Sequence, residues 1–155
     1  VTANSTATTL FDSTFYVLSS DRNVYKCLDN DGNTASTVEP TGTSTSVITT
    51  GDGYKWKYMY TLSAAQQSNF LSTDFMAVAT NSTVSSAATD GGIDIVKIKT
   101  GGSSYTVSGG GTSGTITNVP IRGDGSSAVC SVTLTSGAIS AVTITTNGSG
   151  YTSGI

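Results

Sequence analysis

The chain has 155 residues, which is enough for one sizeable domain or two small ones. Charged residues make up 11% and the net charge is −3, which argues against the clustered Lys and Arg of a nucleic-acid-binding surface. Ser and Thr account for about a third of the chain, so its surface is expected to be polar but nearly uncharged. No apolar run approaches the roughly 18 residues of a membrane span, so we expect no membrane partner.

The first part of the chain predicts short β-strands. Residues 1–10 form a Thr-rich arm, expected to be an extended strand that pairs elsewhere. Apolar runs at residues 15–18 and 24–28 flank polar turn residues and predict a hairpin. Residues 46–49 predict a further short strand.

Four aromatic residues recur at every second position in the next strand, which covers residues 54–62: Tyr54, Trp56, Tyr58 and Tyr60. A period of two predicts that all four rings share one face of the strand. We expect them to form the core of the first half, because each ring buries a large area. The alternative is an exposed stripe that stacks sugars or bases.

One helix is predicted, over residues 63–71. Ser63 with Gln66 three residues later forms a capping box, and Phe70 is expected to pack inward. Residues 79–90 are small, polar and end in Gly, so they are expected to be a linker.

The second half contains a repeat. Residues 91–105 align with residues 137–151 at an offset of 46, as between Tyr105 and Tyr151. Each unit predicts a strand, a tight Gly/Ser turn and a Tyr that folds back onto the core, which makes Tyr105 a fifth core aromatic. Residues 114–121 and 128–135 predict two more strands between the repeats.

The predicted fold is therefore mainly β, with two small sandwich-like or barrel-like modules at residues 1–78 and 91–155 and one short helix. The chain ends just after the second repeat, where the first repeat is followed by further strands. An unpaired edge is a template for another chain, so we expect the arm of a neighbouring copy to fill this place. The candidate assembly residues are Val1, Thr2, Thr8, Thr9, Leu10, Tyr151 and Ile155.

Catalytic chemistry is not indicated. The chain has no His, so no Ser-His or Cys-His pair is possible, and Glu39 is its only Glu. Residues 29–33 resemble the start of a calcium loop, but Pro40 occupies the position of the required Glu. We therefore predict no enzyme activity, no cofactor and no metal. Residues 122–124 spell Arg-Gly-Asp, for which a plain turn is the simplest interpretation.

Two modifications stay open. Asn4, Asn81 and Asn147 fit the N-glycosylation pattern, although chance matches are expected in a chain so rich in Ser and Thr. Cys27 and Cys130 are either buried thiols or, in an oxidising compartment, a disulfide.

Three blocks of the first half together resemble a known family. They are V-Y-K-C-L-D at residues 24–29, T-V-E-P at residues 37–40, and G-D-G-Y-K-W-K-Y-M-Y at residues 51–60. In this order they are similar to the gene-eight-type baseplate wedge protein of contractile-tailed phages, over about residues 15–78. The repeat Tyr residues resemble the Gly-x-Gly-Tyr β-repeats of phage tail and fibre proteins.

The resemblance implies a β-rich packing domain of a virion, without catalysis. We expect a structural protein that self-assembles into a phage tail or baseplate structure, or into an extracellular helical filament. Its partners would be copies of itself and other virion proteins, in a virion or outside the cell. The alternative is a carbohydrate-binding module of a tail fibre that uses exposed aromatics. Because the chain lacks an initiator Met, we expect either a piece of a longer polypeptide or a processed chain.

Overall fold

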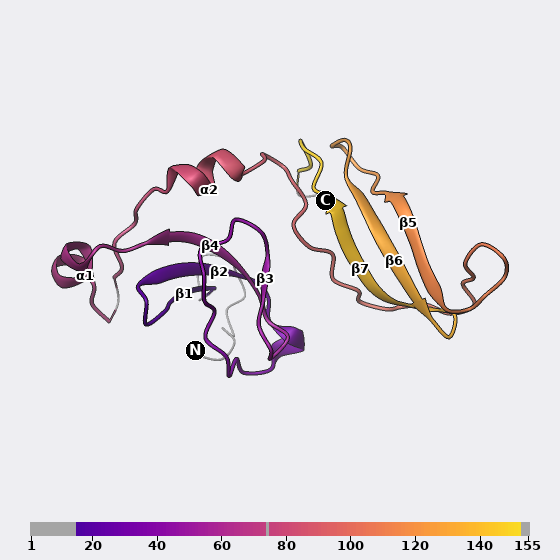
Figure 1. Ribbon diagram of the computed structural model, residues 1–155, viewed down its shortest axis with the longest axis horizontal. Coiled ribbons are helices and arrows are strands. Elements are labelled where there is room, and N and C mark those ends of the chain that lie inside the picture. Colours follow the sequence, from indigo (N-terminus) through magenta and orange to yellow (C-terminus); the bar gives the residue numbers. More distant parts are fainter. Residues whose placement is uncertain (1–14, 74, 153–155) are drawn as a thin grey trace. The chain divides into compact units, whose positions relative to one another are not determined.

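The computed structural model describes residues 15–73 and 75–152 (Figure 1). The chain divides into two compact units, with the boundary after Ala87. Each unit contains one antiparallel sheet, and the helices are short. The predicted mainly-β class is confirmed, with one sheet in each unit.

The N-terminal unit is built on a four-stranded sheet of order β1-β2-β4-β3. Its strands are β1 (Tyr16–Leu18), β2 (Asn23–Asp29), β3 (Ile48–Thr49) and β4 (Lys55–Thr61). β1 and β2 pair antiparallel across a tight turn closed by a bond from Ser19 N to Asn23 O of 2.9 Å, which confirms the hairpin. The central pair is β2 with the aromatic strand β4.

A β-bulge in β4 separates the aromatic rings. Tyr25 of β2 lies opposite Tyr58, but its neighbour Val24 lies opposite Tyr60, so Met59 is an extra residue on β4. Adjacent residues of β2 face opposite sides of the sheet, and residues directly opposite each other share a side. Tyr60 therefore lies on the other face from Tyr58, and the prediction of a single aromatic face is wrong.

Two separate hydrophobic clusters follow from this bulge, one on each face of the sheet. The first contains Tyr25, Tyr54, Trp56 and Tyr58, and the second contains Val24, Tyr60 and Leu62. All four rings of the stripe are buried, and Trp56 is only 2% exposed. The strand thus contributes rings to a cluster on each face, while Lys55, Lys57 and Met59 between the rings stay partly exposed.

The helices lie at the end of this unit. α1 (Ala64–Phe70) has the predicted capping box at Ser63, but Phe70 is 62% exposed and does not pack inward. α2 (Ser82–Ala87) was not predicted; it lies within the segment expected to be a linker, and Val84 packs on the Trp56 cluster. Within the described residues, no helix is long and apolar enough to cross a membrane.

The C-terminal unit contains the sheet β5-β6-β7. The strands are β5 (Gly114–Pro120), β6 (Val129–Thr135) and β7 (Ala138–Thr146). Its most buried side chains are Ala128, Cys130 and Leu134. Residues 93–100, expected to be a strand like β7, do not form a regular strand.

Bulges in both outer strands align the apolar residues of this sheet. In β7, Ile139 and Val142 are three residues apart, yet they lie opposite Leu134 and Val132, which are two apart on β6. The extra residue on β7 is Ser140, which lies between partners of Leu134 and Thr133.

The same device recurs in β5. Ile116 and Val119 are three residues apart and lie opposite Val132 and Cys130 of β6. Asn118 takes a positive φ of 58° inside this bulge, a conformation that Asn tolerates better than most residues. One face of the sheet is thereby apolar across all three strands.

Replacing the buried indole tests the N-terminal core. We expect Trp56→Ala to destabilise the N-terminal unit by about 3–5 kcal/mol, because it opens a cavity in the first cluster. Phe70→Ala is the matched control, because the exposed ring should change the stability by less than about 0.5 kcal/mol. Urea unfolding measures the free energy of unfolding of both variants, followed by circular dichroism for both and also by fluorescence for the control. Equal losses of stability in the two variants would contradict the burial of Trp56 in the core.

Candidate assembly site

The predicted assembly residues fall mostly outside the described part of the chain. Val1, Thr2, Thr8, Thr9, Leu10 and Ile155 lie there, as does Asn4. Tyr151 is described, and its hydroxyl donates to Ile121 O. The site has therefore to be built from the margins of the sheets.

The first repeat of the same chain lies beside β7, on the side of β7 that does not pair with β6. Ile93 N donates to Asn147 O at 2.8 Å, and Ile139 N donates to Gly101 O at 2.9 Å. These two bonds hold residues 93–101 antiparallel to β7 at both of its ends (Figure 1). The expectation of a vacant place beside the second repeat is therefore wrong.

The two repeats are related to each other by a pseudo-two-fold. Ile93 and Ile139 are equivalent positions of the repeats, as are Gly101 and Asn147, so the two bonds just described are counterparts. A second pair of counterparts closes the ends of the repeats. Tyr151 N donates to Gly91 O at 3.1 Å, and Tyr105 N donates to Gly137 O at 3.0 Å.

The backbones of the repeats agree as well. Left-handed φ angles occur at three equivalent pairs of positions, although only the second repeat forms a regular strand. The pairs are Gly91 (63°) with Gly137 (78°), Gly102 (68°) with Gly148 (64°), and Ser104 (65°) with Gly150 (71°). The repeat in the sequence is thus a repeat of conformation and of pairing.

Tyr151 seats its ring on the turn between β5 and β6. Its hydroxyl donates to Ile121 O at 2.8 Å and accepts from Ala128 N at 3.4 Å. A Cβ at Gly125 would lie 2.5 Å from the ring, and one at Gly123 would lie 3.2 Å from it. Gly125 is therefore needed in this turn to admit the ring, and a side chain at Gly123 would be tight against it.

The Arg-Gly-Asp sequence belongs to this seat. The Asp124 carboxylate accepts bonds from Thr152 N and from Thr152 Oγ1, the residue after Tyr151. These bonds, that of the hydroxyl first, lower the pKa of Asp124 below its ordinary value. Asp124 thus fastens the chain that follows the Tyr151 ring.

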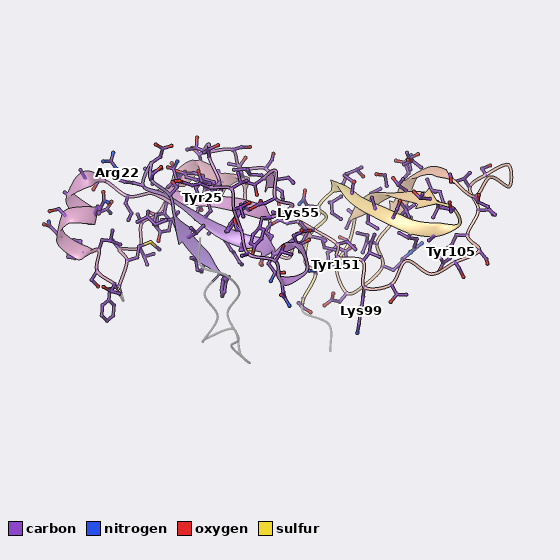
Figure 2. The ribbon with its side chains drawn as sticks, turned by 90° about the horizontal axis from the view of Figure 1, so that it is seen from below. Arg22, Tyr25, Lys55, Lys99, Tyr105 and Tyr151 are labelled. Carbon is purple, nitrogen blue, oxygen red and sulfur yellow. The ribbon has the colours of Figure 1, made fainter. Side chains whose placement is uncertain are left out.

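Tyr105 lacks such a seat. Its side chain is 48% exposed (Figure 2), and its ring lies against Gly102 instead of a distant turn. The prediction that Tyr105 is a core aromatic is wrong. The turn that receives Tyr151 joins β5 to β6, and these strands occur once in the chain, between the two repeats. In the described residues, no comparable turn receives the Tyr105 ring.

The opposite margin of this sheet is β5. β5 pairs only with β6 among the described strands, so it is the edge strand. It is seven residues long and uncharged, and all of it except Val119 is exposed. Ile116 is 36% exposed. Charged side chains are one of the devices that keep natural edge strands from pairing, and β5 has none, which makes it a candidate assembly margin.

Asp52 makes several hydrogen bonds to loops of the N-terminal unit. One carboxylate oxygen accepts from Thr50 Oγ1 at 2.5 Å, and the other accepts from Ser36 Oγ at 2.8 Å, Thr37 N at 2.8 Å and Val38 N at 3.0 Å. These bonds, that of Thr50 first, hold the pKa of Asp52 well below its ordinary value. A single side chain therefore ties two loops together.

Two of the three candidate glycosylation sites lie in the described residues, and both use their amide nitrogens. Asn81 Nδ2 donates to Tyr58 Oη at 3.3 Å, and Asn147 Nδ2 donates to Ile93 O at 2.8 Å and to Asp94 Oδ1 at 3.1 Å. A glycan on Asn147 would cost a bond between the repeats. Both cysteines are thiols, and Cys130 is buried in β6.

Comparison of the chain with protein-family models, with curated proteins and with solved structures finds no match. In the described part of the chain, no group of three or more Cys, Asp or Glu side chains is placed to hold a metal ion. The sheet margins are therefore the features from which a function can be argued.

Removing each repeat Tyr tests the seat. We expect Tyr151→Ala to destabilise the C-terminal unit by roughly 2–3 kcal/mol, because it empties a packed turn and leaves Ile121 O and Ala128 N without a partner. The matched variant Tyr105→Ala should cost less than about 1 kcal/mol, because half of that ring is already in water. Hydrogen exchange of β6 amides measures both, and an equal effect would refute the difference between the two rings.

Acid unfolding tests the Asp52 contact. The folded pKa lies below the unfolded value of about 3.9, so the bonds stabilise the fold fully above that pH and are lost as pH falls through the folded pKa. We expect Asp52→Asn to lower Tm at about pH 7, with the difference from the parent shrinking below about pH 4. Asp21→Asn, in an exposed turn, is the control. A Tm difference that stays constant down to about pH 2 would contradict this.

Proposed function

We propose that this chain is a structural subunit that self-assembles through its sheet margins, in a phage tail or baseplate structure or in an extracellular filament. The observation that carries the proposal is β5, an exposed edge strand of seven residues without a charged side chain. An edge strand without charges offers unpaired backbone donors and acceptors to another strand. Partners would be copies of the chain and neighbouring virion proteins.

The three blocks that resemble a baseplate wedge protein lie together in the N-terminal unit. The first block is β2, which pairs with β4 in the third block. The second block is a loop whose Thr37 and Val38 amides bind Asp52 of the third block. Tyr25 of the first block donates to Gly42 O at 2.7 Å, just after the second block. The matching residues therefore belong to one packed unit and not to scattered positions.

The alternative of a carbohydrate-binding module is less well supported. Sugar binding by the aromatic stripe needs exposed rings, and those of Tyr54, Trp56, Tyr58 and Tyr60 are buried in two clusters. Packing uses the faces of these rings, which favours a scaffold over a binding surface.

Purified protein tests the proposal directly. We expect concentration-dependent association in sedimentation velocity, and fibres or rings in negative-stain electron microscopy. Because charged residues make up only 11% of the chain, association should depend weakly on salt. A monodisperse monomer at every concentration up to about 100 μM would count against the proposal.

A further inference from the structure

One chemically labile pair of residues lies where the two repeats meet. Asn147 and Gly148 are the only Asn-Gly pair in the chain, and they follow directly after β7. An Asn that precedes Gly loses its side-chain amide readily, because the backbone nitrogen of the next residue attacks the amide carbon and Gly has no side chain to hinder the approach. Asn147 is exposed, so water reaches it.

Gly148 is fixed by its packing. Ser126 and Ser149 exchange two backbone hydrogen bonds of 3.0 Å, which bring residues 126–128 close to the end of β7. A Cβ at Gly148 would lie 2.5 Å from Ser126 O and from Ala128 N, and its φ of 64° is left-handed. A side chain at this position would therefore disturb the fold, so the labile pair is part of the structure.

The side-chain amide of Asn147 fastens the first repeat. Its Nδ2 donates to Ile93 O at 2.8 Å and to Asp94 Oδ1 at 3.1 Å, beside the backbone bond from Ile93 N to Asn147 O. Both partners of Nδ2 are acceptors, so only the amide nitrogen satisfies them. These two bonds resist the rotation that would bring the amide carbon to the Gly148 nitrogen.

We propose that Asn147 is a site of spontaneous deamidation, and that the reaction opens the contact between the repeats irreversibly. The Gly148 nitrogen forms a bond to Cγ of Asn147, the bond from Cγ to Nδ2 breaks, and ammonia leaves with the proton that the Gly148 nitrogen loses. The product is a five-membered succinimide. Water then opens the ring, at one carbonyl to give an aspartate and at the other to give an isoaspartate.

The product no longer fits the contact. A carboxylate at position 147 has no donor for Ile93 O, and it lies beside the Asp94 carboxylate, where two like charges repel each other. Since the amide reacts while its bonds are open and the product prevents them from closing, the change accumulates in one direction. The end of residues 93–101 next to Asn147 then separates from β7.

The other end of the contact cannot be lost in this way. The position equivalent to Asn147 in the first repeat is Gly101, which has no side-chain amide. Its bond from Ile139 N to Gly101 O, 2.9 Å long, is therefore unaffected by deamidation. The pseudo-two-fold thus has one labile end and one inert end, which supplies an internal control.

Peptide mapping by mass spectrometry tests the reaction in the whole chain, incubated at neutral pH. We expect Asn147 to deamidate faster than Asn118, because the β-branched Val119 that follows Asn118 hinders the attack. Unfolding the chain in denaturant should speed the reaction at Asn147 by about 5–30-fold, the effect of two lost hydrogen bonds. In the folded chain, Asp94→Ala should speed it by about fivefold, the effect of one. Asp90→Ala, at an exposed position nearby, is the matched control and should leave the rate unchanged.

Hydrogen exchange tests the consequence. Asn147→Asp, which supplies the product directly, should speed exchange of the Ile93 amide by about fivefold or more and leave the Ile139 amide unchanged. Adding Asp94→Asn places an amide donor beside the new carboxylate and should slow the Ile93 amide again. Deamidation at Asn147 no faster than at Asn118 would overturn the proposal. An unchanged Ile93 amide in Asn147→Asp would overturn it as well, and so would an equal change at both amides, which indicates unfolding of the whole unit.

Discussion

The fold depends on single extra residues that let unequal apolar spacings meet in one sheet. Met59 moves Tyr60 to the opposite face of β4, and Ser140 brings Ile139 and Val142 onto one face of β7. A bulge disrupts the ladder locally and increases the twist of the strand. In the N-terminal unit, the bulge divides one aromatic stripe between two hydrophobic clusters. In the C-terminal unit, the bulges give the three-stranded sheet one apolar face. Register, and not composition, decides what each side chain touches.

The pseudo-two-fold explains why equivalent residues have unequal roles. The repeats exchange the same backbone bonds, so Tyr105 and Tyr151 start from the same local geometry. Tyr151 has the turn at Gly125 within reach and is fastened by its hydroxyl, whereas Tyr105 rests on Gly102 and stays half in water. The difference arises from the β5–β6 hairpin, which lies on one side of the two-fold only. Symmetry of sequence therefore does not imply symmetry of burial.

Local signals in the sequence predicted the local structure well. The capping box at Ser63 and the hairpin before Asn23 depend on residues a few positions apart, and both formed. The bulges, the exposed ring of Tyr105 and helix α2 depend on partners far along the chain, such as Val24 opposite Tyr60. The clamp at Asp52 was missed for the same reason, because its partner Ser36 lies 16 residues away. The assembly residues named at the N-terminus lie outside the described chain, and the β5 margin became visible only through the strand order.

A chain so poor in charge has few means of keeping its sheet margins apart. Native edge strands are protected by charged side chains, bulges, Pro or a covering segment. β5 has Pro120 and the bulge at Asn118 but no charge, whereas the first repeat covers β7. A bulge or a Pro shortens the stretch of an edge strand that can pair with another strand but does not prevent the pairing, whereas charged side chains oppose it along the whole edge. A protein that must remain monomeric gains from charges on such a margin; one that must join its copies weakly and many times gains from protection of this partial kind.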